Sequence, residues 1–296
     1  MPRQEITPPQ CAFFDADDTL FPSEPTAMGV AVARLLRTFD EASVLARFGD
    51  EWRAWADQRA GAGRHSADRT LSAYLVARWT GSRYDAMFAE CNEARRASGQ
   101  RPFSSEVAAR SADDNAAETL QALANVGEIR GVGAAIRNVQ RLGMRTVVVT
   151  TSAKDRVLAC MDSPRANLPR SFRPSTSSTT VYSASSLGLE PKPSPEVYLH
   201  AAAAEGVLPQ DVVAIEDSPT GMRSAAAAKI GWKIGFLGAL EHPADRDDRR
   251  EALLAAGADV IAEDGRQLRT ALTLLARGLA PTPERVRGLD APSVAA

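Results

Sequence analysis

The chain has 296 residues, of which 44% are apolar and 24% are charged, and its formal net charge is −2. This balance is typical of a soluble globular protein with one or two domains, and a charge so near zero offers nucleic acid or an anionic membrane no strong field. No apolar run approaches the ~20 residues that span a bilayer. Residues 1–10 lack the apolar core of a signal peptide, and the three cysteines are far apart. We therefore expect a cytoplasmic protein without a membrane or nucleic-acid partner.

The first predicted element is a short buried strand at residues 11–14, Cys-Ala-Phe-Phe, because a continuous apolar run that ends in a turn suits a parallel sheet. Three acids follow within four positions: Asp15, Asp17 and Asp18, with Thr19 next. This segment is either an acidic turn after a strand or a means of delivering carboxylates to a metal ion. Taken alone, it leaves both possibilities open.

Residues 25–125 have a different texture, in which apolar residues recur at helical spacing, for example at Val32, Leu35 and Phe39. Strand signals are scarce, so we expect an all-helical domain. Its charges nearly cancel, which gives no indication of a polyanionic substrate.

Strands and helices alternate over residues 126–280, which predicts a parallel sheet with helices on both faces. Residues 1–24 would supply the first strand of this α/β domain, so the helical domain is an insertion. The expected strands are 144–152, 179–185, 211–218, 232–238 and 258–264, and the expected helices are 131–143, 153–161, 194–206, 219–231 and 266–279.

Two segments are predicted to be irregular. Residues 281–296 are expected to form a disordered tail. Residues 162–180 are rich in Ser, Thr and Pro and are expected to form a long loop beside the site.

Polar residues gather where the predicted strands end, and in open α/β sheets these ends form the ligand site. Carboxylates held together repel one another unless a cation lies among them, and Mg²⁺ takes oxygen ligands, commonly with a substrate phosphate. An ammonium group and hydroxyls suit phosphoryl oxygens. The pattern therefore favours a phosphoryl-transfer site. Its members are Asp15 and Asp17, then Thr150, Thr151 and Ser152, then Lys192, and finally Glu216 and Asp217.

Four motifs in this order resemble those of the haloacid dehalogenase (HAD) superfamily. They are D-x-D-x-T at residues 15–19, a strand ending in Thr or Ser at 147–152, K-P-x-P at 192–195 and E-D-S-x-x-G at 216–221. The similarity extends over about residues 11–275. It implies a Rossmann-like core with an inserted helical C1 cap domain, as in the phosphatase and phosphoglucomutase-like subfamily.

The resemblance also implies roles for the matching residues. Asp15 would be the nucleophile that forms an aspartyl-phosphate, and Asp17 would be the general acid and base. The substrate phosphate would be bound by Lys192, Thr151, Ser152 and the backbone N–H groups of Asp18 and Thr19. Asp18 would also shape the turn, since the family often has glycine there. Mg²⁺ would be bound by Asp15, Asp17 through its backbone carbonyl, Asp217 and Glu216.

Absent residues narrow the activity within the family. Dehalogenases replace the second aspartate of the first motif, which is Asp17 here. Phosphonoacetaldehyde hydrolases use a cap lysine, and residues 20–130 contain none. The mutases carry a histidine soon after the first motif, and residues 21–30 contain none. We therefore expect a phosphatase of a small phosphorylated metabolite, with an intramolecular phosphomutase and a non-catalytic binding protein of this fold as alternatives.

Overall fold

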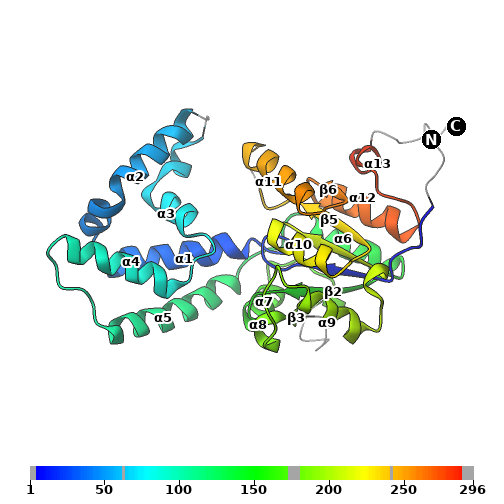
Figure 1. Cartoon of the computed structure of the whole chain (residues 1–296), viewed down its shortest axis with the longest axis horizontal. Helices are drawn as coiled ribbons and strands as arrows, with labels where there is room; N and C mark the ends of the chain where they lie inside the picture. The colour runs from blue at the N-terminus through cyan, green and yellow to red at the C-terminus, as the bar shows by residue number, and fades with distance from the viewer. Residues whose placement is uncertain (1–4, 62–63, 173–180, 241–242, 289–296) are drawn as a thin grey trace. The chain divides into compact units, whose positions relative to one another are not determined.

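The computed structural model describes residues 5–61, 64–172, 181–240 and 243–288 (Figure 1). The chain divides into two compact units. The helical unit is Glu24–Leu123, and the α/β unit combines the chain up to Ser23 with the chain from Ala124 onward. The α/β unit is therefore built from two stretches of sequence, with the helical unit inserted between them.

A six-stranded parallel sheet forms the centre of the α/β unit, which confirms the predicted fold class. The strand order is β3-β2-β1-β4-β5-β6, so β1 lies between β2 and β4 and is buried throughout. The apolar runs that predicted the strands are the residues that the flanking helices cover. The strands are β1 Cys11–Phe14, β2 Arg145–Thr150, β3 Val181–Ser183, β4 Val212–Glu216, β5 Trp232–Phe236 and β6 Val260–Ala262.

The register of the three central strands brings the predicted site residues to one edge. Phe14 of β1 lies opposite Val148 of β2 and Ile215 of β4. The N–H of Asp15 continues the ladder by donating to the Ile215 carbonyl at 3.0 Å. Because the strands are parallel, the residues that follow each of them meet at this edge.

Helices flank the sheet, and their ends follow capping rules. The Ser218 hydroxyl accepts a hydrogen bond from the Gly221 N–H at the start of α10, where Pro219 is the first helical residue. The helices of this unit are α6 Val132–Arg141, α7 Lys154–Asp162, α8 Ala184–Leu187, α9 Glu196–Glu205, α10 Pro219–Ala227, α11 Pro243–Ala255, α12 Gly265–Ala276 and α13 Pro283–Arg287, with 3₁₀ turns η2 Arg170–Phe172 and η3 Pro209–Asp211.

Two irregular segments differ from the prediction or lie partly outside the described residues. The expectation of a disordered tail over 281–296 is wrong for its first part, because Thr282 caps α13 and Val286 of that helix is buried. Residues 289–296 lie outside the described residues. In the predicted loop at 162–180, residues 170–172 form a 3₁₀ turn and residues 173–180 lie outside the described residues.

The helical unit has its own apolar core, and no strand occurs among its described residues. Val32, Leu35, Phe39, Phe48 and Phe88 belong to this core, as their helical spacing predicted. The elements are α1 Ser23–Thr38, α2 Glu41–Gly61, η1 Ser66–Arg69, α3 Leu71–Trp79, α4 Tyr84–Ala97 and α5 Ser105–Leu123. None of the helices in the described parts of the chain has the length and hydropathy of a membrane span.

Candidate active site

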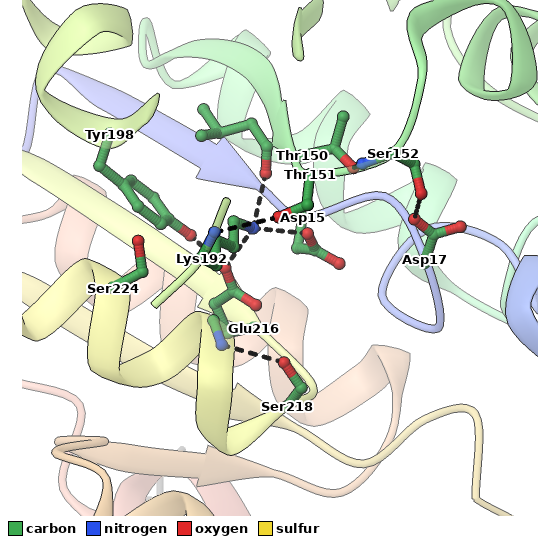
Figure 2. A network of polar contacts seen from close by, with 12 residues as sticks. Asp15, Asp17, Thr150, Thr151, Ser152, Lys192, Tyr198, Glu216, Ser218 and Ser224 are labelled. Atoms are coloured by element: carbon green, nitrogen blue, oxygen red, sulfur yellow. Dashed lines mark hydrogen bonds and ion pairs between the residues drawn. The ribbon is translucent and has the colours of Figure 1, made fainter. Parts of the chain in front are cut away.

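Asp15 stands at the end of the central strand, almost fully buried, at the edge where β1, β2 and β4 finish (Figure 2). Burial raises the pKa of its carboxyl well above the ordinary value, and the nearby carboxylates of Glu216 and Asp217 raise it further. The charge of Lys192 acts in the opposite direction. An ionised Asp15 therefore depends on positive charge next to it.

Lys192 supplies that charge by direct contact. Its ammonium donates to Asp15 Oδ1 at 2.6 Å, to Glu216 Oε1 at 2.6 Å and to the Val149 carbonyl at 2.9 Å. An ammonium group has three protons, and all three find an acceptor here. Burial by itself lowers the pKa of Lys192, but the charges of Asp15 and Glu216 outweigh it and raise the pKa, so the group stays charged.

Glu216 is fully buried at the end of β4, and its two oxygens differ. Oε1 accepts from both Lys192 and the hydroxyl of Tyr198, which comes from α9. Oε2 has no hydrogen-bond partner among the described residues. A buried carboxylate oxygen without a partner is costly, so this end of the site favours a cation or donor beside it.

Three carboxylates are close enough to share one metal ion. One oxygen from each of Asp15, Glu216 and Asp217 lies within 4.8 Å of the other two. Burial raises the pKa of Asp217 well above its usual range, and the charges of Asp18 and Glu216 add to this. Oxygen ligands, buried negative charge and the orphaned Glu216 oxygen fit a hard divalent cation such as Mg²⁺. Asp17 is not part of this carboxylate group, and its predicted contribution through a carbonyl stays a prediction.

Asp217 is also bound by a residue that the sequence did not suggest. Arg249 of α11 donates to the Asp217 carbonyl at 2.8 Å and to Oδ2 at 3.2 Å. The charge of Arg249 lowers the pKa of Asp217 and so opposes the effect of burial. No prediction placed a helix at 243–255, because its sequence is mostly charged.

The Asp17 carboxylate is held by two serines. Ser23 donates to Oδ1 at 2.5 Å. Ser152 donates to Oδ2 at 2.5 Å (Figure 2). Ser152, predicted as a phosphate ligand, therefore contacts the predicted acid and base in this structure, and its binding of phosphate stays a prediction. Ser23 was not predicted, and its place at the start of α1 gave no signal beyond that of a helix cap.

The remaining predicted phosphate ligands have different environments. The Thr151 hydroxyl accepts from the Lys192 N–H at 3.4 Å, so it lies beside the lysine. The Thr19 hydroxyl is buried without a hydrogen-bond partner among the described residues, and a ligand that accepted from it would be stabilised.

Asp18 acts in the turn. Its N–H donates to the Phe21 carbonyl at 2.7 Å, and binding of phosphate by this N–H stays a prediction. Its backbone φ is 54°, a left-handed conformation that asparagine, aspartate and glycine adopt more readily than other residues.

Comparisons with known proteins agree with this geometry. The sequence model of a hydrolase family, haloacid dehalogenase-like hydrolase, matches residues 9–229. A comparison with curated proteins finds no match.

Three solved structures of this architecture resemble the chain. A haloacid dehalogenase-like protein of unknown function from Agrobacterium tumefaciens is 24% identical with a TM-score of 0.58, over 90% of this chain and 99% of that one. A HAD family hydrolase from Deinococcus radiodurans, with bound phosphate and sodium, is 21% identical with a TM-score of 0.58, over 93% and 100%. A putative β-phosphoglucomutase from Thermotoga maritima is 20% identical with a TM-score of 0.61, over 91% and 100%. At these identities the likeness establishes the fold.

Proposed function

Because the chain belongs to the haloacid dehalogenase-like hydrolases, and is thus an enzyme, we propose that it is a Mg²⁺-dependent phosphomonoesterase acting on a small phosphorylated metabolite. The observation that carries the proposal is the buried contact between Lys192 and Asp15, beside the carboxylates of Glu216 and Asp217. A buried carboxylate held by an ammonium, with further oxygens for a cation, suits attack on a phosphate ester.

The proposed reaction has two steps, both centred on Asp15. Lys192 holds Oδ1, so we assign Oδ2 to the attack on phosphorus, which forms an aspartyl–phosphorus bond as the ester P–O bond breaks. Asp17 gives its proton to the leaving oxygen. Water then attacks the phosphoryl group and passes its proton to Asp17, which releases inorganic phosphate and restores both carboxyls.

The other residues orient and stabilise these groups. Asp17 must be protonated to act as the acid, and a serine hydroxyl can then turn to accept from it, so Ser23 and Ser152 would hold the side chain at a fixed position in both of its forms. Lys192, Thr151 and the hydroxyl of Thr19 would face the phosphoryl oxygens. Asp15, Glu216 and Asp217 would hold the Mg²⁺, which when bound offsets negative charge on the phosphoryl group.

The test is the variant Asp15→Asn, assayed for inorganic phosphate release from a panel of phosphorylated metabolites with Mg²⁺ present. We expect release by the wild type to fall by at least 10³-fold in the variant, because an amide cannot act as the nucleophile. Asp155→Asn on α7 is a matched control that removes a carboxylate outside the site, and it should keep wild-type activity. Normal phosphate release by the Asp15 variant would contradict the proposal.

A phosphomutase is the second candidate, since two structures of the same fold are named putative β-phosphoglucomutases. The lack of histidine in residues 21–30 supports hydrolysis instead. Incubation with hexose 1-phosphates separates the two, because net inorganic phosphate indicates a phosphatase and isomerised sugar phosphate indicates a mutase.

We also propose a cytoplasmic location, which the three free cysteines support. The role of the helical unit as a substrate cap stays a prediction.

A further inference from the structure

Tyr198 is a fully buried tyrosine of α9 whose hydroxyl points into the candidate active site (Figure 2). It donates a hydrogen bond to Glu216 Oε1. It lies outside the four sequence motifs, so no role in catalysis was predicted for it.

The Glu216 oxygen that binds Tyr198 is also the oxygen that binds Lys192. The ammonium of Lys192 has three acceptors, and this oxygen is one of them. The position of Glu216 Oε1 therefore helps to determine the position of the Lys192 ammonium. The ammonium in turn helps to orient the Asp15 carboxylate. The phenol is the second donor that fixes this oxygen.

The ring of Tyr198 adds two contacts that keep the phenol in place. Lys192 Nζ lies 5.2 Å from the ring centroid, within the range of a cation–π interaction. On another side the ring stacks on Phe13 of β1, with centroids 6.4 Å apart and planes at 20°. Tyr198 thus contacts three parts of the site. They are strand β1, which precedes Asp15, the ammonium of Lys192, and the Glu216 carboxylate to which both Tyr198 and Lys192 donate.

The buried surroundings favour the neutral phenol, which is the form that donates. Burial raises the pKa of Tyr198 well above its ordinary value, and the charge of Glu216 raises it further.

We propose that Tyr198 is a positioning residue, which holds Glu216 Oε1 so that the Lys192 ammonium is aligned on Asp15 for the attack on phosphorus. This role rests on the proposed phosphatase function. It predicts an effect on the chemical step with little effect on substrate binding, because Tyr198 contacts Glu216 and Lys192 and would act on the phosphate only through them.

The chain contains a matched control in Tyr182. Its hydroxyl donates to Glu205 Oε1 at 2.7 Å, so it also forms a tyrosine–glutamate hydrogen bond, which is partly buried where that of Tyr198 is buried. Glu205 pairs with Arg145 at the opposite end of β2 from the site. Tyr198→Phe and Tyr182→Phe therefore remove the same kind of bond, one inside the site and one outside it.

The experiment measures kcat and KM for phosphate release with Mg²⁺, together with thermal unfolding by circular dichroism, for both variants and the wild type. Activity is expressed per folded molecule at the assay temperature, so that a stability loss does not mimic a catalytic one. We expect Tyr198→Phe to lower kcat about tenfold with KM within about twofold, and Tyr182→Phe to leave both near wild type. Both variants should unfold at a lower temperature.

Two results would overturn the positioning role while leaving the phosphatase intact. One is a kcat for Tyr198→Phe equal to that of Tyr182→Phe. The other is a rise in KM with kcat unchanged, which would place Tyr198 in uniform substrate binding. A wild type without any phosphate release would instead contradict the proposed function, and the positioning role with it.

Discussion

Lys192 is the residue on which the charge balance of the site depends. Its ammonium is nearly inaccessible to solvent and touches both Asp15 and Glu216 at 2.6 Å. Removing one partner of a buried ion pair leaves an uncompensated charge, which is far more costly than losing a pair at the surface.

The first prediction at this scale is that Lys192→Met lowers the free energy of unfolding by about 3–5 kcal/mol and abolishes phosphate release. Urea denaturation in EDTA measures the stability without a bound divalent cation. Lys233→Met is the control, since Lys233 pairs with the more exposed Asp259 at 2.9 Å and should cost about 1 kcal/mol or less. Equal losses of stability in the two variants would show that the contacts of Lys192 stabilise the fold no more than the ion pair of Lys233 does.

The site residues differ in how far the sequence could predict them. Asp15, Lys192, Glu216 and Asp217 stand in motifs, and their convergence follows from parallel strands ending at one edge. The contact of Ser152 with Asp17 could not be foreseen, because it depends on the rotamer of a hydroxyl at a loop. Tyr198 and Arg249 were missed because they reach the site only through the packing of α9 and α11, which the sequence pattern does not specify.

At the scale of elements, the junction between β4 and α10 is packed without spare room. A Cβ added at Gly221, in the first turn of α10, would lie 1.9 Å from Glu216 Oε2 and 2.3 Å from its Cδ. The helix therefore reaches the strand only because this residue has no side chain.

The second prediction is that Gly221→Ala displaces the Glu216 carboxylate, with a stability loss of about 1–3 kcal/mol and at least a tenfold loss of phosphate release. Gly29→Ala in α1 is the matched control, because a Cβ there meets nothing within 4 Å. In that helix interior alanine should raise stability by about 0.5–1 kcal/mol. Thermal melting curves measure the stability of both variants, and the phosphate assay measures their activity. Full activity of the Gly221 variant would show that a side chain at this position does not displace Glu216.

Element prediction from the sequence succeeded where one physical signal dominated. All six strands were predicted, since continuous β-branched and apolar runs have few other uses in a chain of this kind. Helix α11 was missed because charged residues fill most of it and Leu253 is its one fully buried side chain in the described residues. Helix α13 was missed because it has only five residues, and the Thr-Pro pair that starts it was read as tail sequence.

At the scale of the whole molecule, buried thiols are distributed over both units. Cys91 lies in the helical unit, and Cys11 and Cys160 lie in the α/β unit, all buried and unpaired. Burial raises the pKa of each to about 12, from 9.0 for an exposed thiol.

The third prediction is that stability falls as the pH rises above 9. Only the unfolded chain ionises its thiols readily, because burial favours the neutral thiol in the folded state. The stabilisation of the folded state by each neutral thiol is therefore complete below pH 9, and it is lost between pH 9 and 12 as the thiols of the unfolded chain ionise. At pH 10.5 each thiol should lower the free energy of unfolding by roughly 2 kcal/mol relative to neutral pH. Urea denaturation at pH 7.5 and 10.5 measures this.

Cys160→Ala isolates one thiol, and the drop in stability between the two pH values should be roughly 2 kcal/mol smaller in this variant than in the wild type. An Ellman assay gives a second reading, because native thiols should not react at pH 8 and all three should react in denaturant. Rapid labelling of the native protein would contradict the prediction.

The position of β1 has a consequence for how this protein is made on the ribosome. Cys11 leaves the exit tunnel early, yet the residues that pair with it, Arg145 and Val212, are translated only after the whole of Glu24–Leu123. That segment has its own apolar core, so it can become compact before the strands that pair with β1 have been translated. The long delay exposes Cys-Ala-Phe-Phe, an uncharged apolar strand, in the nascent chain. We propose a catalytic role for the acids that follow it in the finished enzyme. In the nascent chain their negative charge would keep this strand from pairing with a wrong partner.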